Sequence, residues 1–86
     1  MFEAVEFVEV SGLGEPRQTL IDEFADEASA VEAARQARKE FLETGSDDYA
    51  WWIVRKTGAS LAEFIADSKS NKEFVLDIAS GQLIEV

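Results

Sequence analysis

Hydrophobic positions along the chain recur in short groups, and most groups have the period-two spacing that is typical of strands. Residues 1–10 are the first such group. Their apolar side chains fall on both faces, and Glu6 interrupts one of the two rows. Apolar residues on both faces are typical of a central strand, and a broken alternation is typical of a bulge. We therefore expect a strand here with one of these two properties.

A second strand is predicted for residues 17–24, with Leu20 and Phe24 on one face and Ile21 on the other. The segment before it, residues 11–16, contains two glycines and the only proline of the chain. These residue types punctuate loops. The first two strands are therefore expected to form a hairpin with a long connection.

The pattern changes to helical spacing over residues 27–44, which are rich in alanine. Asp26 is well placed as the N-cap, because its carboxylate can accept hydrogen bonds from the free amides of the first turn. Gly45 stands where a left-handed residue would end the helix. The stripe predicted to face the core consists of Val31, Ala34, Ala37 or Arg38, and Phe41, with Leu42 beside them.

The strongest strand pattern lies at residues 49–56, where aromatic and β-branched side chains dominate. Trp51 and Trp52 are consecutive, so they must point to opposite faces of a sheet. One of them can lie beneath the helix. The other is either exposed on the second face or buried there by the N-terminal segments, and the sequence leaves both alternatives open.

Residues 60–67 fit two patterns, a short helix with a Ser60–Glu63 capping box or a strand. The strand is favoured, because the Thr57-Gly58 turn before it calls for a pairing partner. Further strands are predicted at 73–78 and 83–86. The fold class that follows is α+β: an antiparallel sheet of four to six strands with one α-helix (about 27–44) packed on one face, in a single domain spanning 1–86.

Composition narrows the classes of function. The chain has 86 residues, no His, no Cys and a formal net charge of −10. The missing His and Cys remove the usual ligands of zinc and most transition metals. The charge repels nucleic acids and anionic membranes, so we expect neither direct nucleic-acid binding nor membrane binding. The acidic N-terminal segment does not resemble a signal peptide, and a cytoplasmic location is expected.

Candidate catalytic chemistry is weak. Three adjacent acidic pairs occur, at Asp22-Glu23, Asp26-Glu27 and Asp47-Asp48, and in so acidic a chain they are best interpreted as solvated surface or helix cap. The Gly-rich segment at 11–16 lacks the Lys-Ser/Thr ending of a phosphate-binding loop. We therefore predict no catalytic residue, no metal site, no cofactor and no enzymatic activity.

The hypothesis that remains is a small protein-interaction module that binds an unknown protein or a second copy of itself through the second sheet face or an edge strand. Exposed tryptophan is common at interaction hot spots. The alternative is an acidic inhibitor that mimics nucleic acid in the basic groove of a DNA- or RNA-handling protein. The candidate interaction surface consists of Trp51, Trp52, Phe64 and Phe74.

In its small size and its richness in Ala and Glu, the chain resembles uncharacterised acidic proteins of actinobacteria and their phages. The resemblance concerns overall composition and includes no specific motif. It therefore implies no activity, cofactor or site residue.

Overall fold

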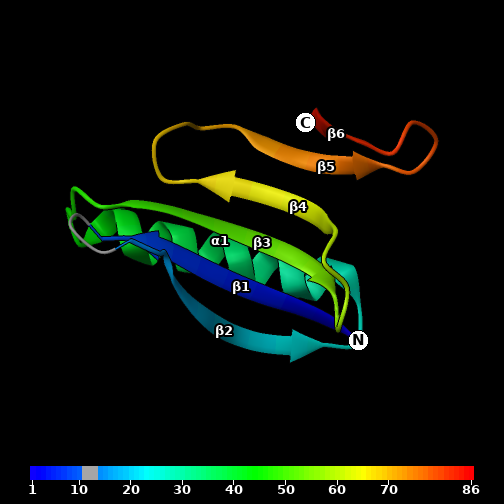
Figure 1. Ribbon diagram of the computed structural model, residues 1–86, viewed down its shortest axis with the longest axis horizontal. Coiled ribbons are helices and arrows are strands. Elements are labelled where there is room, and N and C mark those ends of the chain that lie inside the picture. The colour runs from blue at the N-terminus through cyan, green and yellow to red at the C-terminus, as the bar shows by residue number, and fades with distance from the viewer. Residues whose placement is uncertain (11–13) are drawn as a thin grey trace.

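Six strands and one helix form in the computed structural model, which describes residues 1–10 and 14–86 (Figure 1). The α+β class is confirmed, with one helix on one face of an antiparallel sheet. The elements in chain order are β1 (Phe2–Glu9), β2 (Arg17–Phe24), α1 (Glu27–Glu43), β3 (Tyr49–Lys56), β4 (Ala62–Asp67), β5 (Glu73–Asp77) and β6 (Gln82–Glu85). The predicted loop over 11–16 lies partly outside the described residues. Among the described residues, no helix is both long and apolar enough to cross a bilayer.

The strands lie in the order β2-β1-β3-β4-β5-β6, and every neighbouring pair is antiparallel. Because β2 and β3 flank β1, they run in the same direction and need a crossover connection, which α1 supplies. Of the two alternatives for the first strand, a central position is observed, because β1 lies between β2 and β3. Residues 62–67 are a strand, so the favoured interpretation of that segment is confirmed and the helical one is wrong.

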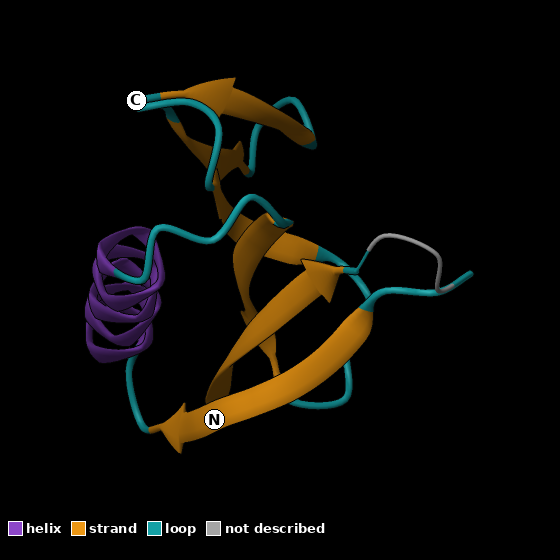
Figure 2. Cartoon of the chain, turned by 90° about the vertical axis from the view of Figure 1, so that its left-hand side faces the viewer, coloured by secondary structure: helices purple, strands orange, loops and turns teal. Residues whose placement is uncertain are grey.

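The main core lies between α1 and the sheet, on the face that we call the helix side (Figure 2). Trp52 and Phe64 are its largest members, and both are 0% exposed. The helix contributes the small residues Ala30 and Ala34, which lets its backbone approach the sheet closely. Phe41 meets the Trp52 ring edge-on, with centroids 5.5 Å apart. The helix therefore packs around one large indole.

Glu6 interrupts the apolar row of β1 because it serves the buried tryptophan. It lies opposite Trp52 in the register of β1 and β3, and the Trp52 indole Nε1–H donates to its Oε2 at 2.9 Å. A buried indole N–H needs an acceptor, since leaving it unpaired costs about 1–3 kcal/mol. The polar residue in this row is therefore the hydrogen-bond acceptor of the core indole.

A bulge in β2 changes the faces predicted for that strand. Ala4 pairs with Asp22 and Val5 with Leu20, so Ile21 is an extra residue in the ladder. One inserted residue reverses the alternation of the side chains. As a result, Phe24 and Ile21 pack against the helix-side core while Leu20 is on the opposite face. The prediction that Leu20 and Phe24 share a face is wrong.

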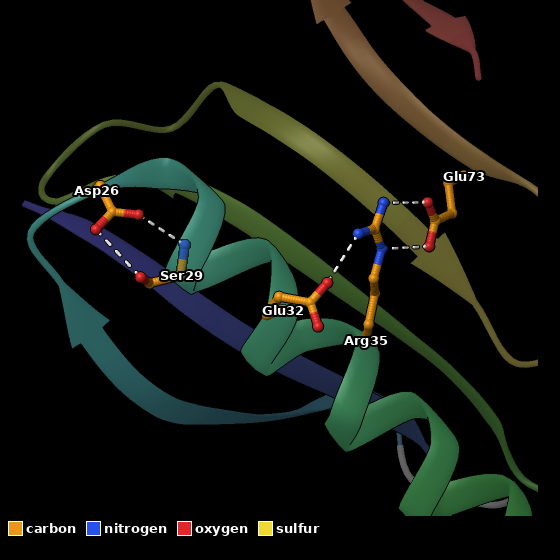
Figure 3. A network of polar contacts seen from close by, with 5 residues as sticks. All are labelled: Asp26, Ser29, Glu32, Arg35 and Glu73. Atoms are coloured by element: carbon orange, nitrogen blue, oxygen red, sulfur yellow. Dashed lines mark hydrogen bonds and ion pairs between the residues drawn. The ribbon is translucent and has the colours of Figure 1, made fainter.

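The predicted helix signals at both ends are confirmed. The Ser29 backbone amide donates to Asp26 Oδ1 at 2.8 Å, and the Ser29 hydroxyl donates to Oδ2 at 3.1 Å (Figure 3). Gly45 follows the helix with a φ of 71°. The sequence predicts Leu42 in the buried stripe, but it is 44% exposed, because its neighbour Phe41 takes the core-facing position and meets Trp52.

Arg35 links α1 to the strand β5. Its Nε donates to Glu73 Oε2 at 2.9 Å and its Nη2 to Glu73 Oε1 at 2.8 Å, and Glu32 receives a third bond (Figure 3). Hydrogen bonding to Arg35 lowers the pKa of Glu73, although partial burial opposes the shift. Hydrogen bonds to Glu73 and then Glu32 raise the pKa of Arg35. This bidentate pair is the main polar link between the helix and β5.

We expect Glu6→Leu to lower the free energy of unfolding by about 1–3 kcal/mol, because the Trp52 indole N–H loses its acceptor. Glu6→Gln is the matched control, since its amide oxygen can still accept, and we expect a smaller loss. Urea unfolding followed by circular dichroism measures both. Equal losses for the two variants would contradict the role assigned to this hydrogen bond.

Glu73→Gln is expected to lower the free energy of unfolding by about 1 kcal/mol at neutral pH, because the pair with Arg35 is half-exposed. The folded state lowers the pKa of Glu73, so the pair stabilises above the unfolded-state pKa and loses its effect as pH falls through the folded-state value. The free energies of unfolding of the unmodified chain and of Glu73→Gln, measured over a pH series, should therefore converge as the pH falls. Glu43→Gln removes one carboxylate from α1 instead of β5 and is the control for the change in net charge.

Candidate functional site

The face of the sheet opposite the helix, which we call the open face, carries a row of apolar side chains. The strand registers place Val5, Ile53, Ile65 and Phe74 side by side across β1, β3, β4 and β5. Leu20 extends this row onto β2. The only helix of the described residues lies on the other face, as Figure 2 shows. Val5 and Ile53, in the middle of the row, are nevertheless buried.

Three aromatic side chains on the open face, Phe7, Trp51 and Tyr49, lie in contact with one another, and we call them the aromatic ladder. The Phe7 and Trp51 rings are stacked, with centroids 5.3 Å apart and planes 5° apart. Trp51 also meets Tyr49, two residues earlier on β3, at 5.5 Å and 37°. Phe7 and Trp51 lie directly opposite each other in the register, which holds the stack in place. The open face therefore presents fixed aromatic rings that are only partly exposed.

Carboxylates surround these rings. On the open face, Glu3 pairs with Arg55 at 2.6 Å, and Glu23 lies opposite Glu3 in the neighbouring strand. Farther along, Glu9 lies opposite Tyr49. Arg55 is the only cationic side chain that the strand registers of the described residues place on this face, and Glu3 already neutralises it. The border of the open face is therefore acidic.

Asp67 links the aromatic ladder to the turn between β4 and β5. Its Oδ1 accepts from the Ser70 and Lys69 backbone amides at 2.7 and 3.0 Å, and its Oδ2 accepts from the Tyr49 hydroxyl at 3.3 Å. Burial alone would raise the pKa of Asp67, but these bonds together with one from the Ser70 hydroxyl outweigh it and lower the pKa. Burial first, and then the charge of Asp67, raises the pKa of Tyr49.

The structure separates the four residues predicted for the interaction surface. Trp51 and Phe74 lie on the open face and are partly exposed. Trp52 and Phe64 lie under α1 and are fully buried, so they leave the candidate surface. Their place follows from the pairing of Val54 with Phe64, which puts both on the helix side with Trp52.

Sequence reasoning missed Phe7 and Tyr49, the two rings that flank Trp51. Phe7 alternates with Glu6 and Val8 in the first strand, and this two-faced pattern was the available signal. The stack itself depends on the cross-strand register, which no single segment specifies. Tyr49 lies two residues before Trp51, and the period of two in a strand therefore predicts that both lie on the same face.

In the described residues, no charged or polar side chain is fully buried, and no three or more Asp or Glu side chains gather closely enough to hold a metal ion. A shallow hollow of about 490 Å³ lies along one stripe of α1, lined by Glu27, Ala28, Val31, Glu32 and Arg35. It is on the helix, away from the aromatic ladder. The arrangement on the open face is suited to contact with a surface.

Tyr49 is the only tyrosine, so the ultraviolet absorbance of tyrosinate measures its titration without overlap from a second tyrosine. We expect a pKa above the ordinary tyrosine value of about 10. Asp67→Asn keeps the turn-capping oxygen but removes the charge, and it should move the pKa part of the way back. An ordinary pKa in the unmodified chain would contradict the contact between Tyr49 and Asp67.

Comparisons of the chain with protein-family models, with curated proteins and with solved structures give no match, so the open face is interpreted from its own geometry.

Proposed function

We propose that the protein is a non-enzymatic interaction module whose open face binds an apolar segment of a partner protein, flanked in that partner by Lys or Arg. The observation that carries the proposal is the partly exposed stack of Phe7 and Trp51, bordered by carboxylates. Aromatic side chains with fixed rotamers lose little entropy on binding and give large contact areas. Trp51 is the central residue of this surface, with Phe74 at its far side.

Charge favours a basic partner over a face-to-face dimer. Two copies meeting through their open faces would bring Glu3, Glu9 and Glu23 of one copy toward the same residues of the other. Like charges at an interface cost free energy, and the formal charge of −10 on each chain adds long-range repulsion. A partner with Lys or Arg around an apolar centre avoids both effects. It also gains electrostatic steering during association.

The alternative, an acidic inhibitor that mimics nucleic acid, requires rows of free carboxylates. Several carboxylates of this chain are already engaged internally, among them Glu3 with Arg55, Glu6 with Trp52 and Glu73 with Arg35. These contacts favour the apolar docking surface over a charged one. A cytoplasmic location, and the lack of direct nucleic-acid and membrane binding, are part of the same proposal.

Selection of a random displayed-peptide library on the immobilised full chain tests the proposal. We expect the selected peptides to combine aromatic or aliphatic residues with flanking Lys or Arg. Trp51→Ala should weaken their binding by at least about tenfold, which is typical of a central hot spot. Ile78→Ala is the matched control, because Ile78 is 88% exposed and lies outside the strands of the open face.

Salt dependence separates the two candidate functions. Binding through an apolar centre should weaken only modestly in high salt, whereas a nucleic-acid mimic should lose most of its affinity. Circular dichroism of Trp51→Ala checks that the variant is folded. The proposal fails if the selected peptides lack apolar residues, or if folded Trp51→Ala binds them as tightly as the unmodified chain.

A further inference from the structure

The strand β6 is a free edge of the sheet. It pairs with β5 on one side and has no neighbour on the other among the described residues (Figure 1). The opposite edge, β2, is protected by its bulge and by the charges of Arg17, Asp22 and Glu23. Bulges and charged residues are the usual devices against pairing of edge strands. β6 has neither bulge nor proline, and its one charged residue, Glu85, is paired with Lys72 at 3.7 Å.

The backbone groups that β6 leaves free follow from its pairing with β5. The Val86 amide donates to the Glu73 carbonyl at 2.9 Å, so Val86 points its backbone groups toward β5. Directions alternate along an antiparallel strand, and Ile84 therefore points the same way. The N–H and C=O groups of Leu83 and Glu85 point outward. Two donors and two acceptors are thus presented at the open edge.

Apolar side chains lie on both faces of this edge. Leu83 is opposite Leu76, on the open face, and is 39% exposed. Ile84 is opposite Val75, on the helix side, and is 48% exposed because α1 covers β1 to β4 and does not extend over β6. An added strand could therefore cover apolar surface on both faces while it satisfies the backbone groups.

We propose that β6 pairs with β6 of a second copy, antiparallel, with the two-fold axis at Ile84. In this register Leu83 of each copy exchanges two backbone hydrogen bonds with Glu85 of the other, so all four free groups on each strand are used. Ile84 faces Ile84 of the second copy in a non-hydrogen-bonded pair, where side chains are closest. An axis at Glu85 would set one carboxylate against the other.

The occupant is a second copy because the free backbone groups of β6 lie symmetrically about Ile84, so an identical strand satisfies all of them. Glu85 of one strand would lie beside Leu83 of the other, and Lys72 already compensates its charge. The strand is only four residues long, so the contact is small and we expect a dimer in the micromolar range or weaker. Salt should strengthen it, because screening reduces the repulsion between two chains of charge −10.

The symmetry of the strand pair also fixes how the helices and open faces of the two copies are arranged, whatever the open face binds. A two-fold axis through an antiparallel strand pair is perpendicular to the sheet. Both helices then lie on one side of a continuous sheet and both open faces lie on the other. The dimer would present two equivalent docking surfaces in one plane, which allows bivalent binding.

Single-cysteine variants test the register, and the chain suits this test because it has no cysteine of its own. Under mild oxidation Ile84→Cys should cross-link to a disulfide dimer much faster than Leu83→Cys or Glu85→Cys, because only position 84 faces itself. Ile78→Cys, which is highly exposed and outside β6, measures random collision. Cross-linking of Ile84→Cys no faster than Ile78→Cys overturns the proposal, and fastest cross-linking at 83 overturns the register.

Sedimentation equilibrium tests the association itself. Leu83→Pro deletes an outward N–H that β5 does not use, so the fold should persist while dimerisation weakens at least about tenfold. Leu83→Ala keeps the N–H and should dimerise more tightly than Leu83→Pro. If Leu83→Pro fails to fold by circular dichroism, Ile84→Lys replaces it, since two like charges at the axis must repel. A strictly monomeric unmodified chain at high salt and high concentration overturns the proposal.

Discussion

One helix is much narrower than a sheet of six strands, and the rest of the structure depends on this difference in width. An α-helix with its side chains is about 10–12 Å across, whereas neighbouring strands are spaced by about 4.8 Å. A single helix therefore covers two or three strands fully and cannot cover six. α1 packs over β2, β1, β3 and β4 around Trp52, which leaves β5 and β6 to one side and, in the part of the chain that the structure describes, the opposite face without a second layer.

The chain reduces the exposure that this constraint creates. On the helix side, alanines at positions 30 and 34 let the helix lie low over the sheet, and Trp52 fills the space between them and Phe41. On the open face, Val5 and Ile53 are 1% and 7% exposed, and the stacked rings of Phe7 and Trp51 lie beside them in the register. Val75 of β5 still packs against this core, and the bidentate pair of Arg35 with Glu73 adds a polar link between α1 and β5. The fold thus has one complete core and one partial core.

Local signals made most of the fold predictable from sequence. Asp26 and Gly45 bounded the helix, and alternation located the strands, because both kinds of signal act within a few residues. The errors arose where a fact about two strands was needed. The bulge at Ile21 exists only relative to β1, and the burial of Phe64 follows from its register with Val54. For the same reason the sequence puts Trp51 and Trp52 on opposite faces, but it does not tell which of them lies under the helix or that Phe7 is the stacking partner of Trp51.

The adjacency of Trp51 and Trp52 restricts how this sequence can change over evolutionary time. Inserting or deleting one residue at the start of β3 would exchange the two rings, because the side chains of a strand alternate. The indole that donates to Glu6 would then face solvent, and the other would lie under the helix without its stacking partner. A change of length within β3 is therefore expected to disrupt both faces of the sheet at once, whereas a substitution in β3 alters one face only.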